Sequence, residues 1–214
     1  MVSVANLNLS SSMCYLCSGD MRLAVQQPEG EDLNEWLAVH TVDCYNELSL
    51  LVGTVAEFIN DTDHPSMTVK GFEFRWADKA HPTPVSVSAR EYIDFVLTWV
   101  EAQINDETIF PTSVDVEFPV DFRSIVGSMM KRMWRIYAFL YEGAGVYEAF
   151  KSIKSGSGEQ QVPASRHLHT CCKHFVFFVL EFNLVPESEL NIMHELVETF
   201  VAKAQGAAAA AASS

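Results

Sequence analysis

Three basic side chains, Lys131, Arg132 and Arg135, form the one cluster of positive charge on a chain whose formal net charge is −14. They lie in an apolar stretch, residues 125–141, in which polar positions recur three or four residues apart and so share one face of a helix. Two guanidinium groups and an ammonium repel one another, and an anion with several acceptor oxygens relieves that repulsion. The spacing therefore predicts an anion pocket, with a phosphorylated side chain of a partner protein as a good candidate.

The alternative interpretation is a solvated stripe, because basic side chains commonly cover the outer face of a buried helix. Nucleic acid is a poorer partner than a compact anion. A phosphate backbone requires a broad basic surface, and this chain has 14 Lys and Arg against 28 Asp and Glu. The composition therefore argues against nucleic-acid binding and leaves a small anion pocket open.

Length and composition indicate one domain, since 214 residues with 49% hydrophobic content supply one well-buried core. No apolar stretch reaches the ~20 residues that span a bilayer, and the N-terminus lacks the order of a secretory signal. We expect no membrane insertion and a cytoplasmic protein, with the nucleus and cell-division structures as further locations. The five cysteines are an odd, scattered set that fits reduced thiols: Cys14, Cys17, Cys44, Cys171 and Cys172.

Acidic residues concentrate where the first long helix is expected to begin. Glu31 and Glu35 are one helical turn apart, and Trp36, Val39 and Asp43 continue the same strip. Carboxylates in a first turn favour the helix dipole, so part of this pattern is ordinary helix chemistry. An aromatic ring among carboxylates is also a common form of binding surface for a basic amphipathic helix. Spacing alone leaves open whether Trp36 binds a partner or packs on its own domain.

Hydrophobic periodicity predicts helices over about 31–60, 88–105, 120–141, 146–153, 164–182 and 186–203. Strict alternation in 72–76 and 85–87 predicts a small β-hairpin, and 154–161 has the composition of a flexible loop. We therefore expect a mainly α fold, a single-domain helical bundle with the hairpin appended, over residues 20–204. Residues 1–19 are expected to form a flexible tail and 205–214 a low-complexity tail.

Several long motifs occur in one order along the chain, in residues 28–36, 92–94, 98–100, 106–111, 131–135, 173–179 and 181–184. Together they resemble the Mob family of kinase-activating adaptors, over nearly the whole chain. The resemblance implies a helical bundle of the Mob type. It also implies a noncatalytic adaptor and co-activator of NDR/LATS-group kinases in Hippo-like, mitotic-exit or cytokinesis signalling.

The resemblance also implies two binding surfaces. In that family an acidic and apolar surface on the first helix docks a basic helical segment beside the kinase domain. The positions that match it here are Glu31, Glu35, Trp36, Val39 and Asp43. A separate basic pocket binds phosphothreonine on an upstream kinase or scaffold, and its positions match Lys131, Arg132 and Arg135.

One family feature is missing from the sequence. Family members typically hold a structural zinc with Cys-x4-Cys and His-x4-His, and these four positions read Ile59, His64, Phe139 and Ala144. One neutral nitrogen donor does not make a tetrahedral zinc site. We therefore expect no cofactor and no metal, with apolar packing in place of the metal tether.

Histidine and cysteine side chains crowd one later helix: His167, His169, Cys171, Cys172 and His174. Three of them recur at helical spacing and form a weak alternative metal site, but buried His and Cys on a helix usually pack or make one hydrogen bond. A Cys/His enzyme is a further alternative, for which no oxyanion-hole motif is present. A degenerate Mob-like scaffold that binds kinases without activating them is the third.

Overall fold

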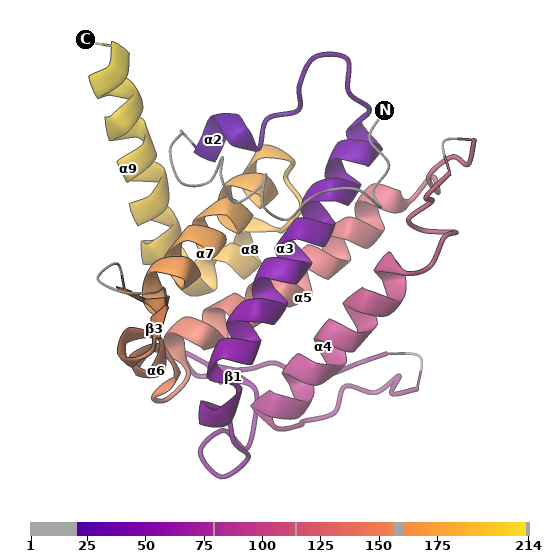
Figure 1. Ribbon diagram of the computed structural model, residues 1–214. Coiled ribbons are helices and arrows are strands. Elements are labelled where there is room, and N and C mark those ends of the chain that lie inside the picture. Colours follow the sequence, from indigo (N-terminus) through magenta and orange to yellow (C-terminus); the bar gives the residue numbers. More distant parts are fainter. Residues whose placement is uncertain (1–20, 79, 114, 156–160, 213–214) are drawn as a thin grey trace.

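Four long helices form the body of the protein in the computed structural model, which describes residues 21–78, 80–113, 115–155 and 161–212 (Figure 1). They are α3 (Leu33–Val55), α4 (Ala89–Ile104), α5 (Phe122–Glu142) and α7 (Ala164–Glu181). In Figure 1, α5 passes behind α3, while α4 and α7 lie on its two sides. The mainly α bundle expected from the sequence is confirmed.

Helix α5 supplies the centre of the core. Apolar side chains recur along it at helical spacing and become inaccessible to water, among them Met129, Met133, Trp134, Tyr137 and Phe139. Each buried side chain of this size contributes about 1.5–3 kcal/mol by leaving water. The indole N–H of Trp134 donates to the Glu189 carbonyl at 2.9 Å, so the polar edge of this buried ring is also satisfied.

Capping residues set the starts of α3 and α4. Asp32 caps α3, since its side chain accepts hydrogen bonds from the backbone N–H groups of Asn34 and Glu35. Ser88 and Glu91 form a reciprocal capping box at α4. The predicted helix over 31–60 is therefore shorter, because it begins after the Asp32 cap and passes at Val55 into a short 3-10 helix, η2 (Ala56–Phe58).

A two-stranded hairpin joins β1 (Thr68–Val69) to β2 (Phe72–Glu73), with Val69 opposite Phe72. Lys70 and Gly71 form the turn with φ angles of 49° and 83°. Two successive positive φ angles make the tight turn whose twist matches antiparallel strands, and glycine takes the second at no steric cost.

The predicted pairing of 72–76 with 85–87 is wrong as a hairpin. Of that pairing the structure keeps a single antiparallel bridge between Trp76 and Val85. The two-residue connection through Lys70 and Gly71 closes a shorter loop than the connection from 77 to 84, so the nearer pairing costs less chain entropy.

The remaining elements are short, with one exception at the C-terminal end. They are α2 (Met21–Ala24), α6 (Val146–Ser152), β3 (Lys154–Ser155), β4 (Val162–Pro163), α8 (Glu187–Leu190), η4 (Asn191–Met193) and α9 (His194–Ala212). Strands β3 and β4 pair, so the segment predicted as a flexible loop has ordered ends; residues 156–160 lie outside the described part.

The predicted helix over 186–203 is divided into α8, η4 and α9, and α9 continues to Ala212, into the segment predicted to be a tail. The predicted N-terminal tail lies outside the described residues. Within the described chain, none of the helices combines the length and the apolar composition that crossing a bilayer requires.

Candidate functional site

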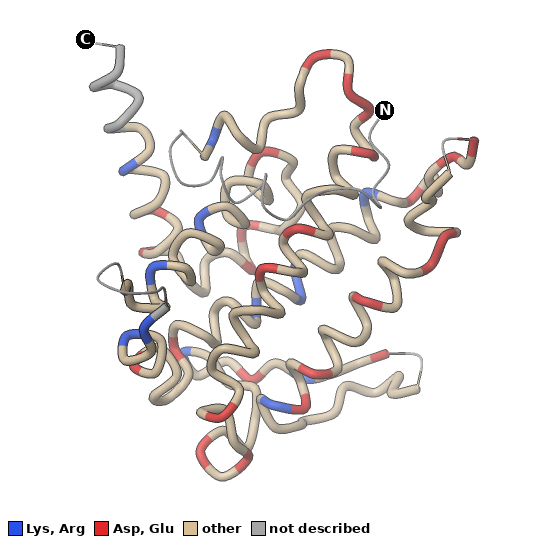
Figure 2. The backbone as a smooth tube through the Cα atoms, viewed as in Figure 1, with Lys and Arg blue, Asp and Glu red and all other residues tan. Residues whose placement is uncertain are grey.

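The acidic α3 face consists of Glu31, Glu35, Trp36, Val39 and Asp43. Glu31 lies in the loop before the Asp32 cap, so it is not one helical turn from Glu35 as the sequence suggested. Its side chain is exposed, and the other four, on α3 itself, are half-buried. Figure 2 shows Asp and Glu recurring along α3, along α4 and in the loops that join them, while Lys and Arg are sparse there. The five positions thus run from the loop before α3 to the middle of that helix.

Trp36 is fixed on two sides by its own domain. Its indole N–H donates to the Val25 carbonyl at 3.0 Å, and its ring meets the ring of His40 edge-on at 4.5 Å. The domain-packing interpretation of this residue therefore holds for its polar edge, while the half-buried ring keeps some surface in water. An aromatic side chain held in place in the free protein loses little conformational entropy when a partner covers it.

Arg135 of the basic cluster is already neutralised inside the protein. Its Nε and Nη2 donate to the two carboxylate oxygens of Glu189 on α8, at 3.2 and 2.9 Å, and Nη1 donates to the Tyr92 hydroxyl at 3.3 Å. The guanidinium also lies over the ring of Phe74. Burial opposes the charge of this group, but the hydrogen bonds to Glu189 prevail and raise the pKa of Arg135. The forked donor edge is therefore occupied by Glu189.

Arg132 lies between two tryptophan rings. Its guanidinium carbon is 4.4 Å from the ring centroids of both Trp76 and Trp99. Such cation–π contacts stabilise the charge by about 0.5–2 kcal/mol each. Nη2 donates to the Ala77 carbonyl at 2.9 Å, whereas Nη1 is buried with no hydrogen-bond partner among the described residues. Burial lowers the pKa of Arg132, which stays charged at neutral pH. Because this Nη1 donor is buried, charged and unpaired, an acceptor that reached it would form a strong hydrogen bond.

Lys131 has a third environment. Half-buried, it lines a surface groove between α5 and the segment that follows α7. The lining of this Lys131 groove includes Ser124, Gly127, Ser128, Lys131, Asn183 and Pro186. The three basic residues thus share a helix but differ in their surroundings, because Arg135 is paired with Glu189, Arg132 lies between two tryptophans and Lys131 lines the groove. Sequence spacing missed Glu189, Tyr92 and the two tryptophans, because they come from distant segments.

In the family that the sequence resembles, four positions hold zinc. In this protein these positions, Ile59, His64, Phe139 and Ala144, form a packed contact. Ile59 and Phe139 are buried, and the ring of His64 meets Phe139 edge-on at 5.2 Å. His64 donates from Nε2 to the Ala144 carbonyl at 3.0 Å. At Gly143 a Cβ atom would lie 2.8 Å from the Phe139 carbonyl oxygen, so the chain also lacks room for a side chain there.

This contact does not fit a zinc ion. Of the side chains at these four positions, His64 alone offers a free nitrogen, because its Nδ1 is buried without a hydrogen-bond partner among the described residues. Two apolar residues and an alanine supply no further donor atoms, and tetrahedral zinc requires four. Across the described chain no group of three or more His, Cys, Asp and Glu side chains is arranged to hold a metal ion.

We therefore expect the purified protein to contain no stoichiometric zinc. Elemental analysis measures this directly. A chelator should leave the melting temperature unchanged, because no metal contributes to folding. One zinc per chain would contradict the apolar-packing interpretation and direct attention to the histidines of α7.

The Cys and His residues of α7 separate into different environments. His167 is exposed, whereas His174 is buried and contacts α3. Burial raises the pKa of Cys172, and burial together with nearby Glu47 raises that of Cys171. A thiol attacks as its thiolate, so these cysteines are poor nucleophiles and the Cys/His enzyme alternative loses support. His174 does belong to a chain of ionisable residues that helix spacing alone left unrecognised.

Comparison with known proteins identifies the family of the chain. The chain is 44% identical to MOB kinase activator-like 1 homolog A of Dictyostelium discoideum over 188 residues, which cover 87% of this chain and 83% of that protein. It is 42% identical to MOB kinase activator-like 1B of Arabidopsis thaliana over 189 residues, with 87% and 83% covered. The model of the Mob1/phocein family matches residues 14–193. This chain belongs to the Mob1/phocein family.

Proposed function

We propose that this protein is a noncatalytic adaptor and co-activator of NDR/LATS-group protein kinases, acting in cell-cycle, cytokinesis or Hippo-like signalling in the cytoplasm. The names of its relatives as kinase activators support a kinase partner. The observation that carries the proposal is the acidic α3 face, in which Glu31, Glu35 and Asp43 accompany a tryptophan that is already held in place.

A basic helical segment of the kinase fits this face. Glu31 and Glu35 lie near Trp36 at the start of α3, where they attract the Lys and Arg side chains of the kinase helix. The ring of Trp36 contacts the apolar side of that kinase helix. Asp43 extends the acidic strip toward the middle of α3. Because the charged groups are at least partly in water, attraction should speed association and weaken as salt screens it.

Reversing Glu31 and Glu35 together to Lys should weaken binding of the kinase segment roughly thirtyfold at low salt, or by about 2 kcal/mol, since like charges at an interface oppose binding. Calorimetry with the basic segment measures the effect. The matched control is Glu57→Lys with Glu107→Lys, two exposed carboxylates outside the acidic α3 face. Affinity that is unchanged in the first variant, or equally reduced in the control, would contradict this docking site.

A kinase activity assay separates the two kinds of adaptor. An activator raises the activity of the bound kinase, whereas a degenerate scaffold binds without raising it. The assay uses the full chain and the complete kinase, and the Glu31 and Glu35 double variant shows whether any rise depends on docking.

The second part of the proposal is a phosphothreonine site on the basic residues of α5. Lys131 contributes an ammonium beside the Lys131 groove, and Arg132 has an unpaired Nη1 donor. Arg135 would have to exchange part of its contact with Glu189 for the phosphate. A dianionic phosphate offers three strong acceptor oxygens, which favours this exchange over a single carboxylate.

A further inference from the structure

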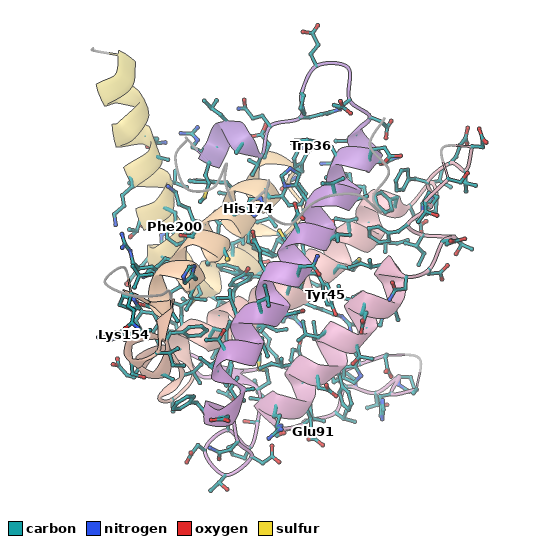
Figure 3. All side chains as sticks on the ribbon, in the orientation of Figure 1. Trp36, Tyr45, Glu91, Lys154, His174 and Phe200 are labelled. Atoms are coloured by element: carbon teal, nitrogen blue, oxygen red, sulfur yellow. The ribbon has the colours of Figure 1, made fainter. Side chains whose placement is uncertain are left out.

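Two histidines and a glutamate form a continuous chain between α3 and α7. His174 of α7 lies between two α3 residues: its Nε2 is 3.2 Å from Nδ1 of His40, and its Nδ1 is 3.2 Å from Oε2 of Glu47. The residues His40 and His174 are 8% and 4% exposed, and the Glu47 side chain is 14% exposed. In Figure 3, His174 on α7 lies beside α3, near Trp36. Three ionisable groups therefore share one buried interface.

Hydrogen-bonding rules leave this chain two forms. A carboxylate only accepts, so the Nδ1–H of His174 donates to Glu47 in both. When His174 is neutral, its Nε2 accepts the Nδ1–H of His40. When His174 is charged, its Nε2–H donates to Nδ1 of His40, whose own proton is then on Nε2. One added proton thus binds at Nε2 of His40 as the Nδ1 proton passes to His174, and no proton is lost.

In the folded protein His40 and His174 together take up one added proton and not two. Burial and the neighbouring His174 lower the pKa of His40 to about 3, so His40 is neutral in both forms. In the unfolded chain His40 takes up its own proton below about pH 6.5. Its depressed pKa therefore contributes stability that is complete above about pH 6.5 and is lost as the pH falls toward about 3.

Other titratable groups belong to the elements that contain or pack against His40, His174 and Glu47. They are Asp43 and Cys44 on α3, Cys171 on α7, Tyr137 on α5, Tyr147 on α6, Glu101 on α4 and Arg22 on α2. Burial raises the pKa of Cys44, Cys171 and Tyr137, so these three stay protonated and uncharged near neutral pH. The Tyr147 hydroxyl is hydrogen-bonded to His169, which is not one of the three linked residues. The groups left to exchange protons between α3 and α7 are therefore the hydrogen-bonded residues His40, His174 and Glu47.

The ring of His40 connects these three hydrogen-bonded residues to Trp36 of the acidic α3 face. His40 stacks on Phe178 of α7 at 4.9 Å with an angle of 22°, and its ring is 4.5 Å from that of Trp36. A transfer of the proton from Nδ1 to Nε2 reverses the ring dipole of His40 at this contact. Charging of His174 also turns its bond to Glu47 into a charge-assisted one, which holds α3 more firmly to α7.

We propose that His40, His174 and Glu47 form a proton-operated positioning device that couples proton uptake between α3 and α7 to the placement of Trp36. It makes His40 and Glu47 positioning residues for the acidic α3 face. This inference rests on the proposed docking role of that face, although the coupling itself is a property of the free protein.

The test is nuclear magnetic resonance of the free protein between about pH 5 and pH 8, where an ordinary imidazole titrates. Nitrogen-15 spectra of the imidazoles report the protonated nitrogen, and the Trp36 indole N–H signal is assigned with Trp36→Phe. We expect His40 to stay neutral but to exchange Nδ1–H for Nε2–H at the midpoint at which His174 becomes charged. The Trp36 signal should move with the same midpoint.

Glu47→Gln keeps a hydrogen-bond acceptor but removes the charge, so it should shift the common midpoint to lower pH. His40→Asn retains one hydrogen-bonding group and should abolish the movement of Trp36. The matched control is His167→Gln, which removes an exposed imidazole from the same helix and should change neither result. Independent midpoints for His40 and His174, or a Trp36 signal that does not move in the wild type, would overturn the proposal.

Kinase binding is measured separately over the same pH range. If the device acts on docking, the pH dependence of affinity should follow the His174 midpoint and should shift in Glu47→Gln. A pH-independent affinity with coupled midpoints in the free protein would overturn the positioning role alone. Absence of any kinase binding would refute the proposed function and would leave the free-protein result standing.

Discussion

Changing Phe139 to Ala should lower the free energy of unfolding by about 3–5 kcal/mol, because truncation of a fully buried phenylalanine removes its burial and leaves a cavity. Phe139 is 1% exposed, and its ring packs on His64 at 5.2 Å. Its neighbour Gly143 approaches so closely that a Cβ atom there would be 3.0 Å from the Phe139 ring. The contact that joins the segment after α3 to the end of α5 should therefore loosen. Denaturant unfolding of the purified protein measures the loss.

The matched control is Phe72→Ala, the same chemical change at a side chain that is 63% exposed in β2. It should cost less than about 1 kcal/mol, in line with ordinary surface substitutions. Both unfolding curves should be the same with and without a chelator. A loss that appears in the wild type only after chelation would show that a metal, and not Phe139, holds these two segments together.

The long helices were predictable from the sequence because local chemistry determines them. Ser88 and Glu91 form the capping box that starts α4, and the apolar periodicity of 122–142 persists over the whole of α5. Ends and short pairings were less predictable. The Asp32 cap placed Glu31 outside α3, and the turn at Lys70 and Gly71 diverted β2 from its expected partner.

The environment of the basic residues was not predictable, since it depends on contacts between distant segments. Helical spacing correctly placed Arg132 and Arg135 on one helix, but it contains no information on Glu189, which lies 54 positions from Arg135. The aromatic rings around Arg132 come from the segment after β2 and from α4. One signal was available for the buried proton chain, because His40 and Glu47 are seven positions apart and so share a face of α3.

Changing both Arg132 and Arg135 to Ala should weaken binding of a phosphothreonine peptide by about a hundredfold or more, and each single change by roughly tenfold, since one charge-assisted bond contributes about 1.5–3 kcal/mol. Arg132 should contribute through its unpaired Nη1, and Arg135 by leaving Glu189 for the phosphate. Calorimetry with phosphorylated and unphosphorylated forms of the same peptide measures the effect, and the unphosphorylated form should not bind.

Arg135→Ala also leaves the partly buried carboxylate of Glu189 without its partner, so a loss of binding could reflect a weakened fold. Arg135→Ala combined with Glu189→Gln removes that unpaired charge, and this double variant should regain stability without regaining phosphopeptide affinity. Arg90→Ala removes one exposed positive charge from α4 and should leave affinity within about twofold, since a distant exposed charge is screened. Recovery of phosphopeptide binding in the Arg135 and Glu189 double variant would show that Arg135 serves only the fold. Binding that survives the loss of both arginines would identify the basic residues of α5 as structural, with Glu189 as the anion that completes them.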